Sequence, residues 1–394
     1  MTNPSAPRWL VVAGGGTSGH VLPALAVADT LVARGVDAGS IAFIGSERGV
    51  EKRLVPAAGY SLTMLGGRGL LRSRAPKAIV ANLKAVAGLV WGTVNTVVSF
   101  VRSRPAVVLS VGGYASVPAC VAAQILRLPL VLAESNAKAG RSVKAFRRYA
   151  KAAAVAFDGT GLERAVNTGN PVRREIIQLA AQEPGVVRAT ARTELGVDPS
   201  IFVLTVFGGS LGARKINEAV LELCEQWSTR RLHIRHVVGE RDLAWAQERR
   251  NAWLDAHPEA ALIYEQVAYE DRMPLWYAAS DLVLCRAGAT SVADLAATGT
   301  PAILVPLPSA AEDHQTANAN AVAADGAAIV LADRDLSGSR LASEVGALMS
   351  DVERRQAMAA AQRRRARLDA GDAVADLVIR CASRPPRYAA LDKR

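Results

Sequence analysis

The sequence predicts an α/β fold made of two Rossmann-like domains that face a cleft. Three observations lead to this prediction. The chain has 394 residues, which is more than one ordinary hydrophobic core accommodates. Short apolar runs alternate with helical stretches along its whole length, a pattern typical of parallel sheets covered by helices on both faces. Each half also opens with an apolar strand that leads into a glycine-rich loop and then a helix.

The apolar runs predict ten buried strands, five in each half of the chain. In the first half they cover residues 9–12, 41–44, 107–111, 130–133 and 152–157. In the second half they cover residues 202–207, 233–238, 262–264, 282–285 and 302–305. The first series ends at a Gly-Asn-Pro-Val-Arg segment, residues 169–173, and a polar stretch follows to about Pro199. We therefore expect an N-terminal domain over residues 1–172, a C-terminal domain over 173–382 and a loose tail over 383–394.

Charge and cysteine usage narrow the classes of partner and compartment. The 47 Lys and Arg residues outnumber the 36 Asp and Glu residues, and the net charge of +11 favours anionic partners such as phosphates, nucleic acid or acidic lipids. The four cysteines lie far apart and form neither a Cys-x-x-Cys pair nor a metal-binding spacing with histidine. This usage favours free thiols in a reducing compartment. The apolar run at residues 9–12 is too short for an export signal, so we expect a cytoplasmic location.

Residues 78–101 form a long apolar segment in which Lys84 is the only charge. Its larger apolar side chains recur at helical spacing on one stripe: Ile79, Leu83, Val86, Val90, Val94, Val97 and Val101. Small and polar residues lie on the opposite stripe, whereas a membrane-spanning helix is apolar around its whole circumference. The segment is therefore predicted to be an amphipathic helix that packs against a sheet, with a membrane-facing role as the alternative.

The first glycine loop, residues 14–19, offers backbone amides at a helix N-terminus, where an anionic group can bind. Its Gly14-x-Gly16-x-x-Gly19 spacing also matches a dinucleotide fingerprint with Glu47 as the ribose-binding acid, which keeps a nicotinamide or flavin enzyme open. His20 follows at the start of the helix, where the helix dipole favours the neutral imidazole. That imidazole can accept a proton from a substrate hydroxyl, or it can simply cap or pack.

Three segments of the second half offer further phosphate and ribose sites. The loop at residues 208–214 can bind phosphate through its amides and Ser210, while Arg214 can reach a phosphate or form a surface ion pair. Residues 285–294 follow a buried strand and open a helix. There Asp294 can accept hydrogen bonds from both hydroxyls of a ribose, or it can be a surface charge favoured by the helix dipole. Gln315 and Asn318 lie one helical turn apart on one face of a predicted helix, where they can bind a ligand or simply cap the helix N-terminus. We expect the acidic cluster at residues 333–335 to be surface.

In the first half, Tyr114 follows the strand at 107–111, and Glu134 and Asn136 follow the strand at 130–133. The carboxyl ends of parallel strands are where open α/β sheets bind ligands, although ordinary loop structure explains these residues equally well.

Taken together, these segments resemble the MurG family of peptidoglycan N-acetylglucosaminyltransferases. The resemblance extends from about Arg8 to about Val330 and rests on the order and spacing of seven segments. They read GGGTSGHVLPALAVA, GGYASVP, ESNAKAG, GNPVR, FGGSLGAR, CRAGATSVADL and DHQTANA. The resemblance implies the glycosyltransferase-B fold and inverting transfer of N-acetylglucosamine from its UDP donor to undecaprenyl-pyrophosphoryl-muramyl-pentapeptide (lipid I), which gives lipid II. It implies no cofactor and no metal, and a role in cell-wall synthesis, cell shape and division.

The resemblance also assigns roles to individual residues. The residues that would contact UDP-N-acetylglucosamine are Thr17, Ser18, Gly19, Asn136, Arg173, Ser210, Glu270, Ala289, Thr290, Ser291, Val292, Ala293, Asp294 and Gln315. Glu270 would contact uracil through its backbone. His20 is the candidate catalytic base, and Tyr114 and Glu134 would lie on the acceptor side. The chain departs from the family pattern at Asp294, usually Glu, at Ala133, often His, and at Ser18, usually Gly.

A lipid-linked acceptor implies contact between the first domain and the cytoplasmic face of the cell membrane. The residues suited to an anionic membrane surface are Arg68, Arg72, Arg74, Lys77 and Lys84, which flank Leu70, Leu71, Ile79 and Leu83. No nucleic-acid partner is expected. The alternatives are a related glycosyltransferase that acts on another lipid, a UDP-N-acetylglucosamine epimerase of similar fold, and a non-catalytic scaffold at the site of cell-wall assembly.

Overall fold

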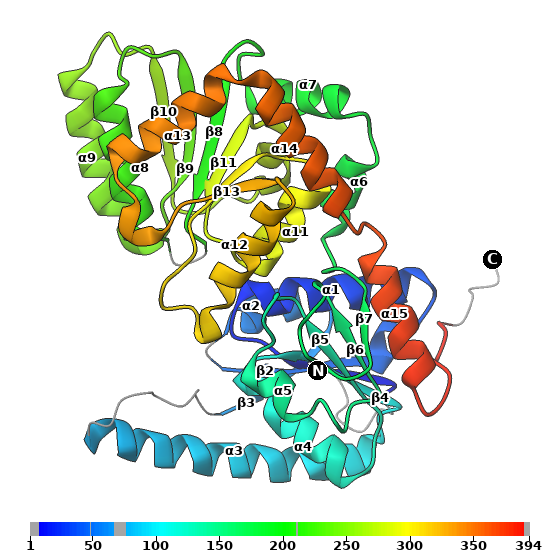
Figure 1. Ribbon diagram of the computed structural model, residues 1–394. Helices are drawn as coiled ribbons and strands as arrows, with labels where there is room; N and C mark the ends of the chain where they lie inside the picture. Colours follow the sequence, from blue (N-terminus) through cyan, green and yellow to red (C-terminus); the bar gives the residue numbers. More distant parts are fainter. Residues whose placement is uncertain (1–7, 48, 67–75, 210–211, 390–394) are drawn as a thin grey trace. The chain divides into compact units, whose positions relative to one another are not determined.

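The computed structural model describes residues 8–389 except 48, 67–75 and 210–211, and it leaves out the side chains of residues 76–81 and 84. The chain divides into two compact units (Figure 1). Unit 1 contains Met1–Arg173 and Asp369–Arg394, and unit 2 contains Arg174–Leu368. The boundary expected between residues 172 and 173 therefore differs by one residue from the division after Arg173.

Unit 1 is built on a parallel sheet of seven strands in the order β3-β2-β1-β4-β5-β6-β7. The strands are β1 (Leu10–Gly14), β2 (Ile41–Ser46), β3 (Ser61–Leu65), β4 (Val107–Gly112), β5 (Leu130–Glu134), β6 (Ala152–Val155) and β7 (Ala165–Asn167). The helices are α1 (Ser18–Ala33), α2 (Glu51–Ala57), α3 (Pro76–Ser103), α4 (Val117–Ile125), α5 (Arg141–Ala145) and α15 (Ala370–Cys381). Alternate residues of β1 enter two apolar clusters, Leu10 and Val12 in one and Val11 and Ala13 in the other, because successive side chains of a strand point to opposite faces.

Unit 2 is built on a parallel sheet of six strands in the order β10-β9-β8-β11-β12-β13. The strands are β8 (Phe202–Phe207), β9 (Leu232–Val237), β10 (Leu262–Val267), β11 (Leu282–Cys285), β12 (Ala302–Leu304) and β13 (Ala328–Val330). The longer helices are α6 (Arg174–Ala180), α7 (Pro184–Leu195), α8 (Arg214–Gln226), α9 (Leu243–Ala256), α10 (Met273–Ala279), α11 (Ala289–Thr298), α12 (His314–Ala324), α13 (Gly338–Ser350) and α14 (Val352–Arg365).

In each sheet the strand order reverses beside the strand that comes first in the chain, and this reversal indicates the edge at which ligands bind. In unit 1 the reversal lies between β1 and β4, and in unit 2 it lies between β8 and β11. Open α/β sheets bind ligands outside the carboxyl ends of the strands at such a point. The loops at these two points are the glycine-rich segments that the sequence analysis singled out.

All ten expected strands are present, and three further strands, β3, β7 and β13, were not predicted. Each of the three lies at the edge of its sheet. Strand β7 is exposed along its length and β3 is only partly covered. Edge strands such as β3 and β7 need no continuous apolar run, which was the signal used to find the others. Strand β13 does lie in such a run, residues 327–331, and this run was missed.

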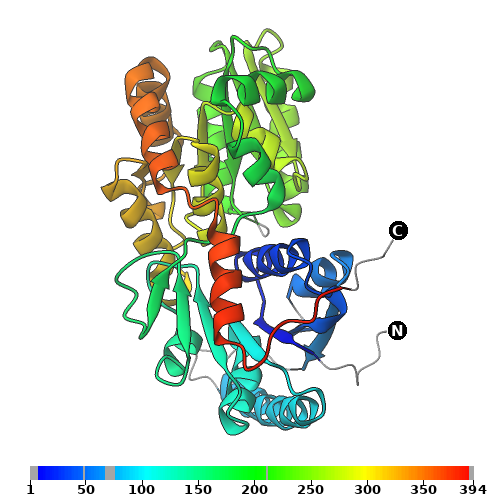
Figure 2. The ribbon, with the colours of Figure 1, turned by 90° about the vertical axis from the view of Figure 1, so that its right-hand side faces the viewer.

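The C-terminal helix belongs to unit 1, so its assignment to the C-terminal domain is wrong. Helix α15 packs against α1 (Figures 1 and 2), and Val374, Leu377 and Val378 enter the same apolar cluster as the strands of unit 1. On the surface, Arg34, the C-cap residue of α1, forms ion pairs with Asp372 and Asp376.

The expectation of a loose tail is also wrong for residues 383–389. The backbone amide of Ser383 donates to the carbonyl of Ala106, and the amide of Ala389 donates to the carbonyl of Gly35. Tyr388 forms an antiparallel bridge with Val36. The sequence of this segment, rich in Pro and Arg, gives no sign of these contacts because they depend on a strand edge and turn that lie far away in the chain.

Helix α3 is present as predicted, but the prediction that its apolar stripe packs against the sheet is wrong. Among the described side chains, Leu83, Val86, Val90, Val94 and Val101 are exposed. The buried face instead carries Ala85, Gly92, Thr96, Phe100 and Ser103, and it packs on α4. Most of these residues are small, which allows the two helices to approach closely. The covered face coincides neither with the predicted apolar stripe nor with the stripe opposite to it, so helical spacing predicted the helix but not its covered face. By length and composition alone, residues 85–103 could cross a membrane.

Candidate functional site

In unit 1 the glycine loops after β1 and β4 pack directly on each other. A Cβ atom on Gly14 would lie 2.5 Å from the carbonyl oxygen of Gly112, and a Cβ on Gly113 would lie 2.8 Å from that of Gly15. Gly14 and Gly113 also have positive φ angles of 144° and 78°. Glycine is therefore required at these positions by close backbone approach and by conformation.

The first glycine loop does not leave all of its amides free for an anionic ligand, which corrects the expectation for this loop. The amide of Gly16 donates to the Glu51 carboxylate at 2.8 Å. Helix α1 begins two residues later at Ser18, with Thr17 as its N-cap residue and no hydrogen bond from the Thr17 side chain to the helix amides. Ser18 is helical and is not among the residues with positive φ, so its replacement of the family's glycine causes no backbone strain.

His20 lies in the first turn of α1, as predicted, beside the loop after β4. Its Nδ1 is 3.4 Å from the Thr17 hydroxyl, and a Cβ on Gly112 would lie 3.6 Å from its Nε2. A cavity of about 20 Å³ adjoins His20 and is lined by Glu134, Ser135 and Asn170 among others. This volume is enough for one water molecule.

Glu134 uses its carboxylate to shape its own loop. One oxygen accepts from the backbone amide and the side-chain amide of Asn136, at 3.0 and 2.9 Å, and the other accepts from the amide of Gly140 at 2.8 Å. Glu134 is 5 % exposed. The geometry makes it the residue that orients Asn136, which the resemblance assigns to the sugar. Ser135 donates to Asn170 and joins this loop to the segment at residues 169–173.

Tyr114 is held by helix α3. Its hydroxyl donates to the carbonyl of Ala85 at 2.8 Å, and burial raises the pKa of Tyr114. The side chain therefore couples the loop after β4 to α3. Arg173 ends unit 1 and is partly buried.

In unit 2 the second glycine loop precedes α8, but Ser210 lies outside the described residues. Gly212 has a φ of 72°, and a side chain there would collide with the carbonyl of Val238, so the loop packs tightly on the end of β9. Arg214 begins α8 and donates to the buried Asp242 at 2.9 Å, while its guanidinium stacks on Trp245. The ion-pair alternative for Arg214 is therefore the one observed.

A buried polar network that the sequence analysis missed supports this loop. His236 of β9 is hydrogen-bonded to Asn217 of α8 at 3.0 Å and to the Tyr264 hydroxyl of β10 at 2.9 Å. Asn217 donates in turn to Asp242 and to the carbonyl of Val238. Burial lowers the pKa of His236 to about 3, so the imidazole is neutral and binds as a fixed partner. The position of His236 in the strand sequence LHIRHV gives no sign of such a network.

The N-terminus of α11 is the clearest anion and ribose site of unit 2. Its N-cap residue is Gly288, which has no side chain to cap the helix. The first amides of the helix therefore receive no hydrogen bond from an N-cap side chain. Asp294 follows within the second turn and is 2 % exposed. The buried Thr290 hydroxyl has no hydrogen-bond partner among the described residues. The six residues 289–294 that the resemblance assigns to UDP thus form the first part of one helix.

Two other predicted residues lie next to this helix in the fold. Gln315 accepts through its Oε1 from the amide of Leu307 at 3.0 Å, and Asn318 donates to the carbonyl of Ala287 at 3.1 Å. These bonds connect α12 to the loops after β11 and β12. Asp333 was expected to be surface away from these loops, but its carboxylate pairs with Arg286 at the end of β11, which corrects that expectation.

Glu270 is buried, and its side chain is occupied within the protein. One carboxylate oxygen accepts from the Arg235 guanidinium and the other from the amide of Arg272 at 3.0 Å. The expectation that only its backbone meets uracil is compatible with this arrangement. Among the described residues, no cluster of three or more His, Cys, Asp or Glu side chains could hold a metal ion.

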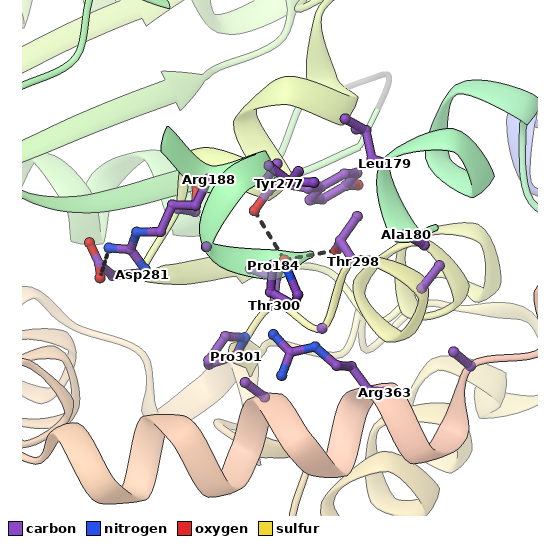
Figure 3. A pocket seen from close by; sticks show the side chains of 18 of the residues that line it. Leu179, Ala180, Pro184, Arg188, Tyr277, Asp281, Thr298, Thr300, Pro301 and Arg363 are labelled. Atoms are coloured by element: carbon purple, nitrogen blue, oxygen red, sulfur yellow. Dashed lines mark hydrogen bonds and ion pairs between the residues drawn. The ribbon is translucent and has the colours of Figure 1, made fainter. Parts of the chain in front are cut away.

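Unit 2 also contains a larger cavity, of about 700 Å³ (Figure 3). Arg188, Tyr277, Thr298, Thr300 and Arg363 are among its lining residues, and none of the predicted site residues is. It includes Asp281 and Pro301, which directly precede β11 and β12. The cavity therefore lies at the amino ends of these strands, opposite to the edge that carries the glycine loops.

Two domain families match the chain. Residues 10–155 match the glycosyltransferase family 28 N-terminal domain, and residues 203–374 match the C-terminal domain of the same family. Among curated relatives, UDP-N-acetylglucosamine–N-acetylmuramyl-(pentapeptide) pyrophosphoryl-undecaprenol N-acetylglucosamine transferases are similar over nearly their whole length. The transferase of Alkalilimnicola ehrlichii is 38 % identical and that of Acidothermus cellulolyticus 37 % identical. The alignments cover 94 and 95 % of this chain and 98 % of each relative.

Solved structures agree with these matches at the level of the fold. The structure of Acinetobacter baumannii MurG is 28 % identical, with a TM-score of 0.73 over 94 % of this chain and 99 % of that one. A structure from Listeria monocytogenes named for UDP-N-acetylglucosamine 2-epimerase is 13 % identical, with a TM-score of 0.61 over 93 % of this chain and 95 % of that one. At this lower identity the likeness concerns the fold alone.

Proposed function

The chain belongs to the glycosyltransferase 28 family of MurG-type N-acetylglucosaminyltransferases, and we propose that it moves N-acetylglucosamine from UDP to undecaprenyl-pyrophosphoryl-muramyl-pentapeptide. The product is lipid II, a precursor of peptidoglycan, and we extend the proposal to roles in cell shape and division. The observation that carries the proposal is the N-terminus of α11. It combines a helix N-terminus that has no side-chain cap with a buried carboxylate, at the point where the strand order of unit 2 reverses.

On the donor side, the first amides of α11 suit the charge of the UDP diphosphate, because a helix N-terminus carries a partial positive charge. The Asp294 carboxylate can accept hydrogen bonds from both ribose hydroxyls. Gln315 is oriented for this site because its Oε1 is held by the amide of Leu307, which leaves the side-chain NH2 group as a donor.

The proposed chemistry is a single displacement with inversion. The 4-hydroxyl oxygen of the acceptor sugar forms a bond to the anomeric carbon of N-acetylglucosamine, and the bond from that carbon to the β-phosphate oxygen breaks and releases UDP. The proton of the attacking hydroxyl passes to His20, and positive charge from Arg173 stabilises the departing diphosphate. The location of His20 in the first turn of α1, beside the switch point of unit 1, supports this role.

Replacing His20 tests the base assignment. A His20→Ala enzyme should lose about 10²- to 10⁴-fold in kcat, the usual contribution of a general base. Its affinity for UDP-N-acetylglucosamine, measured by calorimetry, should be unchanged because the residues of unit 2 remain intact. An enzyme with wild-type kcat would remove His20 from the base role.

The overall reaction is tested by incubation with labelled UDP-N-acetylglucosamine, with and without a lipid I analogue. Label should enter a disaccharide product only when the acceptor is present. Isomerised sugar in the absence of acceptor would instead identify an epimerase, and no reaction in either case would favour the scaffold.

We also propose that unit 1 binds the cytoplasmic surface of the cell membrane peripherally through the exposed face of α3. Trp91 is 68 % exposed and Leu83 66 % exposed, and Val86, Val90, Val94 and Val101 continue the same surface. Such a face suits the boundary between headgroups and acyl chains, where Trp is enriched. Of the basic residues expected to flank it, Arg68, Arg72 and Arg74 lie outside the described residues, as do the side chains of Lys77 and Lys84.

Vesicle co-sedimentation tests this surface. The Trp91→Glu/Val94→Glu double variant should lose binding to vesicles that contain anionic lipid, because two charges enter the apolar face. The matched control is the Val186→Glu/Val352→Glu variant, which changes two apolar residues of unit 2 that are each more than half exposed. Equal binding by both variants and the wild type would refute the proposal.

A further inference from the structure

The Glu51 carboxylate is an internal anion that binds the first glycine loop. It begins α2, and its side chain is 1 % exposed. Its Oε2 accepts from the amide of Gly16 at 2.8 Å, and its Oε1 accepts from the amide of Ser46 at 2.7 Å and from the Ser46 hydroxyl at 2.8 Å. One carboxylate therefore joins the loop after β1 to the loop after β2.

Three glycines surround this carboxylate. A Cβ atom on Gly15 or Gly49 would collide with its oxygens, and a Cβ on Gly45 would lie 2.5 Å from the Glu51 Cγ. Gly15 belongs to the loop after β1, whereas Gly45 and Gly49 belong to the end of β2 and the following loop. The chain thus has glycine at one position in the loop after β1 and at two positions shortly before Glu51, and these three glycines enclose one buried group.

The carboxylate is ionised at neutral pH. Burial by itself raises the pKa of Glu51, but the hydrogen bonds from the Ser46 and Gly16 amides outweigh burial and hold the pKa below its ordinary value. Hydrogen bonds to a charged acceptor are stronger than those between neutral groups, so the loop is held firmly.

We propose that Glu51 is a positioning residue, which sets the conformation of the first glycine loop and through it the place of His20. Gly16 directly precedes Thr17, the N-cap residue of α1, and His20 lies in the first turn of that helix. The direction of the α1 N-terminus therefore depends on where the Gly16 amide is held. This inference rests on the proposed function through the role of His20, and it adds a residue for which neither the motifs nor the family resemblance supplied a role.

The Glu51→Gln variant tests the proposal with almost no change of volume. A glutamine can still accept from Ser46 through its carbonyl oxygen, but its NH2 group then faces the Gly16 amide, and two donors cannot pair. The matched control is Glu47→Gln, the same substitution at an exposed position four residues earlier. Ser46→Ala serves as a second control, because it removes one hydrogen bond of the same carboxylate without touching the glycine loop.

Two readouts distinguish positioning from a merely structural role. In Glu51→Gln, kcat should fall about 10- to 100-fold, the loss expected when a catalytic group is displaced by about 1 Å. The dissociation constant of UDP-N-acetylglucosamine should change much less than kcat, because most residues assigned to the donor, including those of α11 and α12, belong to unit 2, and only Thr17, Ser18 and Gly19 lie in the displaced loop. Hydrogen exchange of the peptide that covers residues 13–19 should accelerate in Glu51→Gln and in neither control. A wild-type kcat together with accelerated exchange would overturn the proposal, and so would equal losses in kcat and donor affinity.

The Glu51→Asp variant keeps the test decisive if Glu51→Gln does not fold. It retains the charge but is shorter by one C–C bond, ~1.5 Å, so it cannot reach Gly16 and Ser46 together. Reduced kcat with faster exchange at residues 13–19 is expected, and full activity would refute the proposal. The exchange measurement needs no substrate. If the wild type showed no transfer at all, the proposed function would be wrong. The exchange measurement would still show whether Glu51 holds the loop.

Discussion

At the scale of single residues, Asp294 is the group on which the donor site depends most. Replacement by Ala should raise the KM for UDP-N-acetylglucosamine about 10- to 100-fold, the loss expected for hydrogen bonds to a charged group. Asp294→Glu restores the residue usual in the family and should bind the donor nearly as well as the wild type. Asp255→Ala, at an exposed position of unit 2, is the control. Steady-state kinetics with varied donor would contradict the assignment if Asp294→Ala kept the wild-type KM.

His236 should make the protein less stable in acid. Its pKa is about 3 in the folded protein because of burial, against an ordinary value of 6.5. As the pH falls below 6.5, the unfolded chain takes up a proton that the folded protein does not bind. The free energy of unfolding therefore falls, by about 1.4 kcal/mol for each pH unit below about 6, until the pH approaches 3.

Urea unfolding at pH 7, 6, 5 and 4 measures this effect against the His236→Gln variant. The variant should be less stable at pH 7, because the substitution disturbs the hydrogen bonds that His236 makes with Asn217 and Tyr264. Its disadvantage should shrink as the pH falls. A stability difference that stayed constant over this range would show that His236 does not carry the acid sensitivity.

At the scale of elements, α15 shows how a helix at the end of the chain completes the core at its beginning. Truncation of the buried Leu377 to Ala should destabilise unit 1 by about 2–5 kcal/mol. Hydrogen exchange should then accelerate in peptides from β1, β2 and β4, and not in peptides from β8 to β13. Leu348→Ala, at a buried position of α13 in the core of unit 2, should give the opposite pattern. Faster exchange confined to unit 2 in Leu377→Ala would reject the assignment of α15.

Helix α3 shows the limit of pattern analysis at the same scale. Its apolar spacing correctly predicts a helix, but the covered face carries Ala85, Gly92 and Thr96, which belong to neither of the two predicted stripes. Hydrophobicity favours burial of the other face. Close packing on α4 and the Tyr114 bond to the α3 backbone favour small side chains at most covered positions, with Phe100 as the large buried exception, and the other large apolar residues form an exposed surface.

At the scale of the whole molecule, the net charge of +11 should make membrane binding depend on salt. Binding to anionic vesicles should weaken as NaCl rises from about 0.1 M to about 1 M, because the screening length falls from ~10 Å to ~3 Å. A residual fraction should stay bound at high salt through the apolar face of α3. Co-sedimentation across this range measures both contributions, and binding independent of salt would mean that charge takes no part.

The sequence by itself determined the two Rossmann-like halves, ten of the strands and the glycine loops at their carboxyl ends. These features are local, because an apolar run followed by glycines and a helix forms the same unit wherever it occurs. Only the tertiary structure decided which groups occupy those loops and which surfaces are covered. Glu51 at the Gly16 amide, His236 between α8 and β10, and α15 on α1 all join segments distant in the chain. Such contacts arise from packing in three dimensions, so sequence spacing carries no signal for them.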